Sequence, residues 1–434
     1  MFSRSEKVVV APRSSSDDGG YAQDPAAVEY DSDLHVECPP HTTDRRLVNR
    51  IDFRVIPYLC ILYLLAFLDR VNIANANVFG LSEDLGLASK DSMKYNIALV
   101  IFFVPYVLFE VPSNVLLKKV SPRASVWMHV LLWIYYCYAR IGPELFWTAG
   151  NKIFILEGLL TVVVSVIFFF LLPNFPEEAN WLSEDEKRYV KARLQADQGR
   201  SAAERQITIR DIGRVFKDPK IWVGGFMYFG LIVPAYGYAY FSPAILKTYG
   251  YSAIQTQLHS VPPWAAAFGL AMTVAWLSDK TRHRFLFTLI PIAIAIAGFG
   301  ILISVHDNVD VQYAGLFLVA MGCYSAMPVI VCWFNLNTGG HHRRSVASAW
   351  QVGFGNIGGI ISVFAFLSKD APDYIPGHSI CIAFICLSAL SCTLYWVLCS
   401  WSNRKRDKTP TNLGLTEWEK TEMGDLSPDY RYQL

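Results

Sequence analysis

The chain has 434 residues, of which 53% are hydrophobic, 14% aromatic and only 17% charged, and its 38 basic and 37 acidic residues leave a net charge of +1. Soluble domains carry about 25% charged residues, whereas here long apolar blocks alternate with short charged gaps. This pattern excludes a soluble globular enzyme, a disordered chain and a nucleic-acid binder.

The first 50 residues are polar and rich in Ser, Asp, Gly and Pro, which is typical of a disordered tail. Beyond them, ten blocks are long enough to cross a bilayer as helices of roughly 20 residues. Transmembrane β-strands would be about half that length and would alternate in polarity. We therefore expect an all-α polytopic membrane protein. The ten predicted spans cover residues 55–76, 97–117, 126–147, 153–173, 221–246, 261–277, 285–305, 311–334, 346–367 and 379–401.

The distribution of Lys and Arg between the gaps predicts the orientation of the chain. Basic gaps alternate with non-basic gaps along all ten spans, and the longest basic gap lies between residues 174 and 220. Because cytoplasmic loops of membrane proteins are enriched in Lys and Arg, we expect both termini and this central gap to be cytoplasmic. Ser183 and Glu186 in the gap have the spacing of a capping box, which predicts a charged surface helix from about Lys187 to Leu194. This helix is either a solvated linker or a regulatory docking segment.

Charged residues inside two predicted spans are candidates for function. A charge at the centre of a bilayer helix costs at least roughly 2.5–3.5 kcal/mol, so it usually faces protein or water. Asp69 and Arg70 lie in the outer half of the first span, where Arg70 would hold a carboxylate through two hydrogen bonds. The alternative is a structural ion pair that anchors the helix end. Glu110 in the second span is either a protonatable coupling group or a gating partner for a basic residue.

Two later spans contain helix-breaking residues beside polar or aromatic ones. The fifth span holds Pro234 with Tyr236 and Tyr240, and the eighth holds Pro328 with Trp333 and Asn335. Interrupted helices at corresponding places in two halves are typical of a transporter binding site, although packing explains most aromatic residues in such spans. Asn356 in the ninth span lies among small residues, and it serves either helix packing or a site.

No sequence pattern indicates catalysis or a cofactor. Eight of the nine cysteines lie in apolar stretches, where a free thiol packs as a small hydrophobe. The Cys and His residues do not have the spacing of metal ligands, and no nucleophile, base and orienting group recur together. We expect neither an enzyme nor a bound metal or cofactor.

Five sets of stretches between about Arg46 and Trp401 share a pattern: residues 62–76, 96–99 with 109–114, 153–161, 277–280 and 355–359. They resemble fungal major facilitator transporters of the anion:cation symporter group, to which the allantoate and nicotinic acid permeases belong. The resemblance implies six plus six helices around an internal cavity that opens alternately to either side. Residues 140–150 do not resemble the family and stand where its fourth and fifth helices belong, so we expect a 4 + 6 arrangement. Since two helices are lost together, the charge alternation is unchanged.

The resemblance implies proton-coupled symport of a small organic anion, such as a vitamin-like or ureide carboxylate, by a monomer in the plasma membrane. Arg70 would bind the anion, and Asp69 or Glu110 would carry or gate the proton. The alternatives are export of a fungal metabolite and a truncated membrane protein that transports nothing. The residues expected to line the path are Tyr63, Asn72, Tyr236, Tyr240, Trp333 and Asn335. The expected regions are a tail (1–50), an incomplete bundle (51–173), a central loop (174–220), a six-helix bundle (221–402) and a second tail (403–434).

Overall fold

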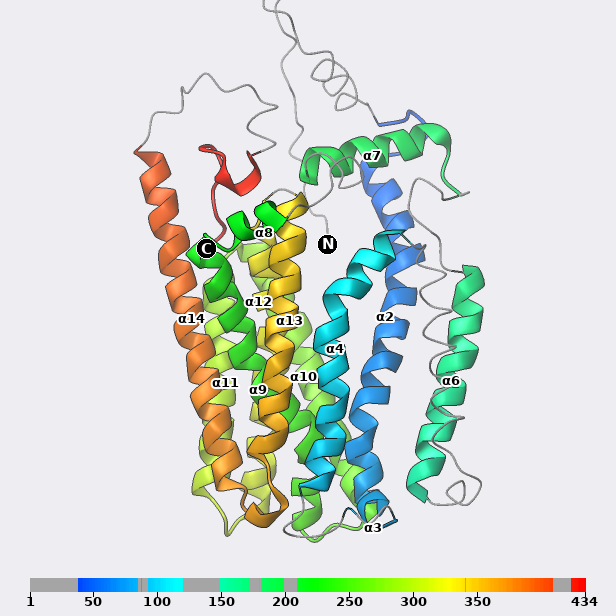
Figure 1. The fold of residues 1–434 in the computed structure, drawn as a ribbon, viewed down its shortest axis with the longest axis vertical. Coiled ribbons are helices and arrows are strands. Elements are labelled where there is room, and N and C mark those ends of the chain that lie inside the picture. The colour runs from blue at the N-terminus through cyan, green and yellow to red at the C-terminus, as the bar shows by residue number, and fades with distance from the viewer. Residues whose placement is uncertain are drawn as a thin grey trace, which may run out of the picture.

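The computed structural model shows a bundle of long helices that run roughly parallel to one axis (Figure 1). It describes residues 38–84, 87, 93–119, 149–171, 179, 181–198, 209–339, 341–408 and 423–434. The long helices are α2 (Asp44–Val78), α4 (Lys94–Lys119), α6 (Ala149–Leu171), α9 (Pro219–Thr248), α10 (Ala253–Thr281), α11 (Arg284–Ser304), α12 (Val309–Leu336), α13 (His341–Ala365) and α14 (Ile375–Asp407). The shorter ones are α3 (Leu81–Asp84), α7 (Glu184–Gln198) and α8 (Ile209–Val215), with 3₁₀ turns η3 (Ser368–Asp370) and η4 (Gly424–Leu426).

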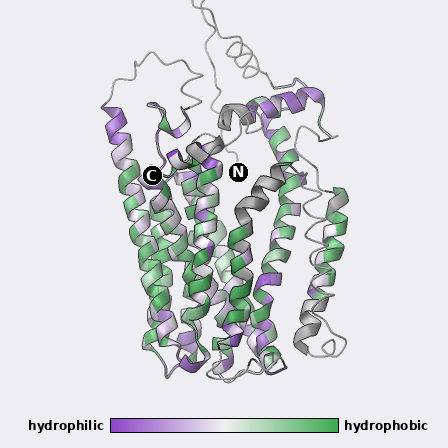
Figure 2. Ribbon diagram, viewed as in Figure 1, coloured by the Kyte–Doolittle hydropathy of each residue, from purple (hydrophilic) through white to green (hydrophobic). Residues whose placement is uncertain are grey.

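The long helices coincide with nine of the ten predicted spans, and the third predicted span lies outside the described residues. Within the described residues, six helices are long and apolar enough to cross a membrane: α2, α9, α10, α11, α12 and α14. The apolar stretches of α4 and α6 are shorter. Figure 2 shows the apolar lengths of the bundle and the hydrophilic α7 across one end. We call that end of the bundle the α7 end and the opposite one the α3 end.

Two groups of helices make up the bundle. The first group consists of α2, α4 and α6, in which α2 packs against α6 and α4 lies between α2 and α13 in the view of Figure 1; α9 to α14 form the second group. The first group meets the second where α4 packs against α13 and α2 packs against α9. Among the side chains that the structure describes in this group, those that belong to the large apolar core, such as Ala74, Tyr95 and Phe103, lie toward the α3 end of α2 and α4.

Helix α9 lies at the centre of its group because its neighbours pack on several sides of it. Side chains of α13 and α14 also donate to its backbone, Trp350 to the carbonyl of Ile221 at 3.1 Å and Ser388 to that of Met227 at 2.7 Å. Residues Pro234 and Pro243 lie inside α9, which nevertheless runs unbroken from Pro219 to Thr248. The interruption expected in this span is therefore absent.

Helix α7 begins at the predicted place and has the predicted cap. The Ser183 amide donates to Glu186 Oε2 at 3.0 Å, and the Glu186 amide donates to Ser183 Oγ at 3.3 Å. The helix docks on the start of α2, where Arg193 pairs with Asp44 and Arg50 pairs with Glu186 at 3.2 Å. A small apolar cluster containing Leu47, Leu182 and Val190 lies beneath these ion pairs.

Residues 423–434, which we call the C-terminal segment, fold back over the α7 end of the second group. Asp425 is buried and pairs with Arg343 at 2.9 Å. The Gln433 carbonyl accepts from Trp333 Nε1 and Asn337 Nδ2, both at 2.9 Å. The segment also takes hydrogen bonds from α14, since Arg406 donates to the carbonyls of Tyr430 and Asp425. It therefore ties α12, α13 and α14 together.

Candidate functional site

The charged pair of α2 faces two different neighbours. Asp69 and Arg70 lie two to three turns before the α3 end of the helix, at Val78. Successive residues of an α-helix point about 100° apart, so adjacent side chains reach different partners. Arg70 points toward α9, and Asp69 points toward α6. The structure thus separates a guanidinium side and a carboxylate side of the same helical turn.

On the guanidinium side, Arg70 Nη1 donates to the hydroxyl of Tyr236, and its guanidinium carbon lies 5.8 Å from the Tyr236 ring centroid. Tyr236 Oη lies 3.5 Å from Asn356 Oδ1, which brings α13 into the group. Tyr240 stacks on Tyr236 one turn away, with ring centroids 5.8 Å apart. Phe103 of α4 packs edge-on against both rings. Four helices therefore converge on Arg70.

On the carboxylate side, α2 and α6 run antiparallel and exchange polar contacts. Asn72 Nδ2 donates to Glu157 Oε1, and the Thr161 hydroxyl lies 3.4 and 3.5 Å from the two carboxylate oxygens of Asp69. Asn75 Nδ2 donates to Asn72 Oδ1 at 2.8 Å, which orients the Asn72 amide toward Glu157. Two carboxyl groups thus share one helix interface inside the bundle.

Two further contacts join the helix groups closer to the α3 end. Asn96 Nδ2 donates to the backbone carbonyls of Val363 and Phe366 at 2.6 and 3.1 Å. Lys247 Nζ donates to the carbonyl of Val78 at 3.2 Å. Backbone carbonyls at a helix C-terminus lack partners within the helix, so an amide or ammonium donor fixes the two groups together at this end.

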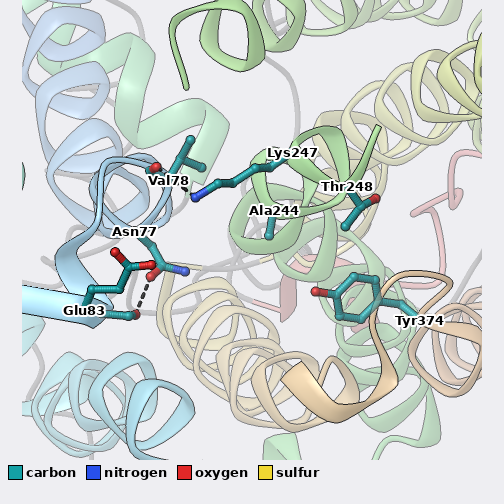
Figure 3. Close-up of a pocket in the computed structure, with 8 residues that line it drawn as sticks. Asn77, Val78, Glu83, Ala244, Lys247, Thr248 and Tyr374 are labelled. Atoms are coloured by element: carbon teal, nitrogen blue, oxygen red, sulfur yellow. Dashed lines mark hydrogen bonds between the residues drawn. The ribbon is translucent and has the colours of Figure 1, made fainter. Parts of the chain in front are cut away.

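A cavity of about 280 Å³ lies beside the Lys247 contact. Figure 3 shows Asn77 and Val78 on one side of it, with Lys247, Thr248 and Tyr374 on the other. Asn77 follows Arg70 by two turns of α2, roughly 10 Å along the helix axis. The cavity is therefore at the α3 end, and Arg70 is not among the residues that line it.

The structure brings together some of the predicted site residues and separates others. Arg70, Tyr236 and Tyr240 form one group, and Asp69 and Asn72 lie next to it on the α6 side. Tyr63 is 73% exposed on α2 and does not join this group. Trp333 and Asn335 lie near the α7 end of α12, where Trp333 is fully buried under the C-terminal segment and Asn335 donates to its own helix at Val331.

The side chain of Glu110 lies outside the described residues, and its role stays a prediction. Three residues that contact the two sides of α2 are not part of the predicted site: Asn356 on the guanidinium side, and Glu157 and Thr161 on the carboxylate side. Asn356 had been recognised only as a packing or site residue. Glu157 is the single acidic residue of the apolar helix α6, and this isolated charge in a membrane span is the sequence feature that indicates a functional role. Among the described residues, no group of three His, Cys, Asp or Glu side chains is placed to hold a metal ion.

Comparison with known proteins agrees with this architecture. Residues 136–363, more than half of the chain, match the model of the Major Facilitator Superfamily. The chain belongs to this superfamily of transporters. It is accordingly an all-α, multi-pass membrane protein that acts as a secondary transporter, not an enzyme.

The similar proteins are fungal transporters of comparable length. An uncharacterised transporter of Schizosaccharomyces pombe is 27% identical, with 94% of this chain and 93% of the relative aligned. An MFS-type transporter of Penicillium expansum is 26% identical, with 94% of each chain aligned. The high-affinity nicotinic acid transporter of Saccharomyces cerevisiae is 24% identical, with 92% of this chain and 86% of the relative aligned.

Proposed function

We propose that this transporter moves a small organic anion together with a proton, by alternating access. The observation that carries the proposal is Arg70, a cation within a membrane helix that reaches the junction of α2, α4, α9 and α13. A guanidinium is always charged and presents its donors in a planar fork that fits a carboxylate. The name of the Saccharomyces relative, a nicotinic acid transporter, supports an organic acid as the cargo.

The surroundings of Arg70 favour a planar or aromatic carboxylate. Tyr236 and Tyr240 stack in parallel beside the guanidinium, and Phe103 closes the group edge-on. An aromatic ring would pack against these faces while its carboxylate meets Arg70. The Tyr236 hydroxyl and the Asn356 side chain add hydrogen-bonding groups at the same place. Of the other predicted path residues, Asn72 lies beside this group, whereas a role for Tyr63, Trp333 and Asn335 would require another conformation.

Alternating access needs contacts that close one end of the bundle at a time. Asn96 and Lys247 supply such contacts at the α3 end. In the proposed orientation, the basic α7 end faces the cytoplasm, as the distribution of Lys and Arg predicts, and the structure is closed toward the outside. We place the protein in the plasma membrane as a monomer.

We also propose that the first helix group lacks two helices of the usual six. The alignment with the Schizosaccharomyces relative extends over 473 positions but includes only 94% of this chain, about 408 residues, so about 65 of its positions have no residue of this chain. The relative therefore contains stretches that have no counterpart here. This supports an absence of the fourth and fifth helices near residues 140–150, and sequencing the transcript across this region tests it.

Transport is tested with purified protein in liposomes. Radiolabelled nicotinate serves as the probe, with an acidic outer buffer and a neutral lumen. We expect accumulation that a protonophore abolishes. Arg70→Lys keeps the charge but loses the planar fork, so uptake should fall roughly tenfold to hundredfold, as expected from about 1.5–3 kcal/mol for hydrogen bonds to a charged group.

The matched control is Arg188→Lys, which makes the same replacement on the exposed side of α7 and should leave uptake unchanged. Full activity of the Arg70 variant would remove Arg70 from the binding site. If nicotinate and a panel of other carboxylates, allantoate included, show no flux in correctly folded protein, the symport proposal fails.

A further inference from the structure

We infer that Glu157 of α6 is the residue that carries the coupled proton, and that Asp69 positions it. This inference rests on the proposed proton-coupled function and assigns a role that neither the sequence pattern nor the relatives indicate. It is carried by the polar interface between α2 and α6, which lies on the opposite side of α2 from the Arg70 group.

The contacts across this interface are reciprocal. Glu157 of α6 accepts from Asn72 of α2, and Asp69 of α2 accepts from Thr161 of α6. Asp69 and Asn72 are three residues apart, and Glu157 and Thr161 are four apart, so each pair lies on one helix face. Since the helices are antiparallel, both contacts form in the same register. An unrelated surface carboxylate would not be held in this way.

Glu157 retains capacity for a proton. Its Oε1 accepts from Asn72, whereas its Oε2 is shielded from solvent and has no hydrogen-bond partner among the described residues. Asn75 holds the Asn72 amide in the donor orientation. A carboxyl oxygen that is buried without a donor is poorly suited to hold a negative charge. Protonation of this oxygen would remove the charge and supply a donor in its place.

Of the two charged residues on the facing turn of α2, only Asp69 is directed toward α6. Asp69 lies close enough to repel an ionised Glu157. On the same turn of α2, Arg70 is directed to the other side, toward Tyr236. Helix α3 also contacts α6, and it contributes the acidic residues Glu83 and Asp84 near the α3 end. The charged side chain of α2 that faces the Glu157 helix is thus a carboxylate, and a neutral Glu157 would not repel it.

The arrangement connects the proton to the substrate through a single helix. In the empty outward-facing carrier, a proton from the outer solution binds the Glu157 carboxylate and gives the neutral acid. This removes the repulsion with Asp69, whose neighbour in sequence is Arg70. After the bundle opens to the other side, the carboxylic acid releases its proton to the cytoplasm and regenerates the carboxylate. Any shift of α2 that accompanies these steps also moves Arg70 relative to Tyr236.

The test measures proton binding directly, so that it does not depend on knowing the substrate. Infrared difference spectra of the full-length protein in lipid nanodiscs are recorded between acidic and neutral pH, in light and heavy water. The C=O band of a protonated carboxyl group shifts when its proton is exchanged for deuterium, and this exchange is slow for a buried group. All proteins carry Asp425→Asn, which removes the buried carboxyl of the C-terminal segment. We expect such a band in this background and its loss when Glu157→Gln is added, while Glu184→Gln on the exposed surface of α7 retains it.

Asp69→Asn distinguishes the two carboxyl groups of the interface. If Glu157 carries the proton, this variant keeps the band at a changed frequency, because the neighbouring charge is gone. A band that persists in Glu157→Gln but disappears in Asp69→Asn overturns the assignment. Thr161→Val is a second variant that retains both carboxyls, and it shows whether the helix interface tolerates substitution, with the band retained as the expected result.

Transport then provides a separate readout. In Glu157→Gln we expect nicotinate exchange between the two sides of the liposome to persist and accumulation driven by the pH gradient to disappear. Accumulation at the wild-type level would overturn the inference while leaving the symport proposal intact. Conversely, loss of the infrared band in a protein that moves no carboxylate would support proton binding by Glu157 and contradict the proposed function.

Discussion

Helices α9 and α2 both begin at the α7 end of the bundle, yet their apolar side chains are buried to very different extents. The most apolar 18-residue stretch of α9 is 94% buried within the protein, whereas that of α2 is 6% buried. Helix α6 resembles α2 in this respect, with Leu156 at 68% and Phe170 at 72% exposure. The second helix group is therefore stabilised by its own core, while the first presents much of its apolar surface outward.

This contrast separates two ways of holding a membrane helix. Where apolar side chains face lipid, they gain little from contact with another helix, because lipid tails are equally apolar. Helices of the first group are held instead by specific polar contacts, such as those of Asn72 with Glu157 and of Arg70 with Tyr236. The second group relies on close packing. Substitutions of the same type should therefore have different effects in the two groups.

The largest difference is expected for a matched pair of leucines. Leu231 of α9 is fully buried and Leu156 of α6 is mostly exposed. Leu231→Ala should destabilise the protein by about 2–5 kcal/mol, because it removes packed methyl groups and leaves a cavity. Leu156→Ala should change the stability by no more than about 0.5 kcal/mol. Thermal unfolding in detergent measures both, and equal losses would show that the first group is as tightly packed as the second.

A second, smaller effect is expected where helices α11 and α12 approach closely. A Cβ added at Gly322 would lie 2.5 Å from both the Ala295 nitrogen and the Pro291 oxygen, and these backbone atoms have little freedom to move. Gly322→Ala should cost about 1–3 kcal/mol through overpacking. Gly300→Ala is the control, since nothing lies within 4 Å of the added atom. Similar melting temperatures for the two variants would mean that this helix contact is looser than described.

The smallest effect concerns the C-terminal segment and pH. Burial raises the pKa of Asp425 above its usual value of 3.8, and the nearby Arg343 only partly opposes this. The docked segment therefore holds the proton more tightly than the free one, so docking is strongest at low pH and weakens as the pH rises through the raised pKa. Hydrogen exchange of residues 423–434, corrected for its intrinsic pH dependence, should increase as the pH rises above about 4.

Asp425→Asn removes the titrating group and should abolish this dependence. Asp429→Asn, on the exposed side of the same segment, should retain it. Protection that grows with pH in the wild-type protein would show that the ion pair with Arg343 outweighs the cost of burial.

The helices and the α7 cap were accessible from sequence because they depend on local patterns. Apolar blocks predicted nine described helices, and the spacing of Ser183 and Glu186 predicted the start of α7. Helix α9 continues through Pro234 because the surrounding helices hold α9 in place. A local sequence pattern could not predict this. The docking of α7 on Asp44 and Arg50 also depends on residues about 140 positions away.

The site was predicted as a set of residue types but not as an arrangement. Arg70 and Tyr236 were both selected, yet their contact joins positions 166 residues apart. Trp333, like Tyr236, is an aromatic residue with a hydrogen-bond donor near a proline of a predicted span. It nevertheless lies beneath the C-terminal segment, whose polar sequence does not indicate that it folds back. Glu157 was overlooked because its significance depends on Asn72, which only the packing of α6 on α2 reveals.

The docking of α7 on α2 also limits how far the two helix groups can separate. Helix α7 is fixed to the first group, and α8 packs against α13 of the second. The chain that connects α7 to α8 has ten residues, 199–208. Eleven backbone steps from Gln198 to Ile209 reach at most about 40 Å when fully stretched. A rocking motion that needs a wider gap would have to detach α7 from α2 or α8 from α13. The length of this connection therefore sets an upper limit on how far the two helix groups can separate during the transport cycle.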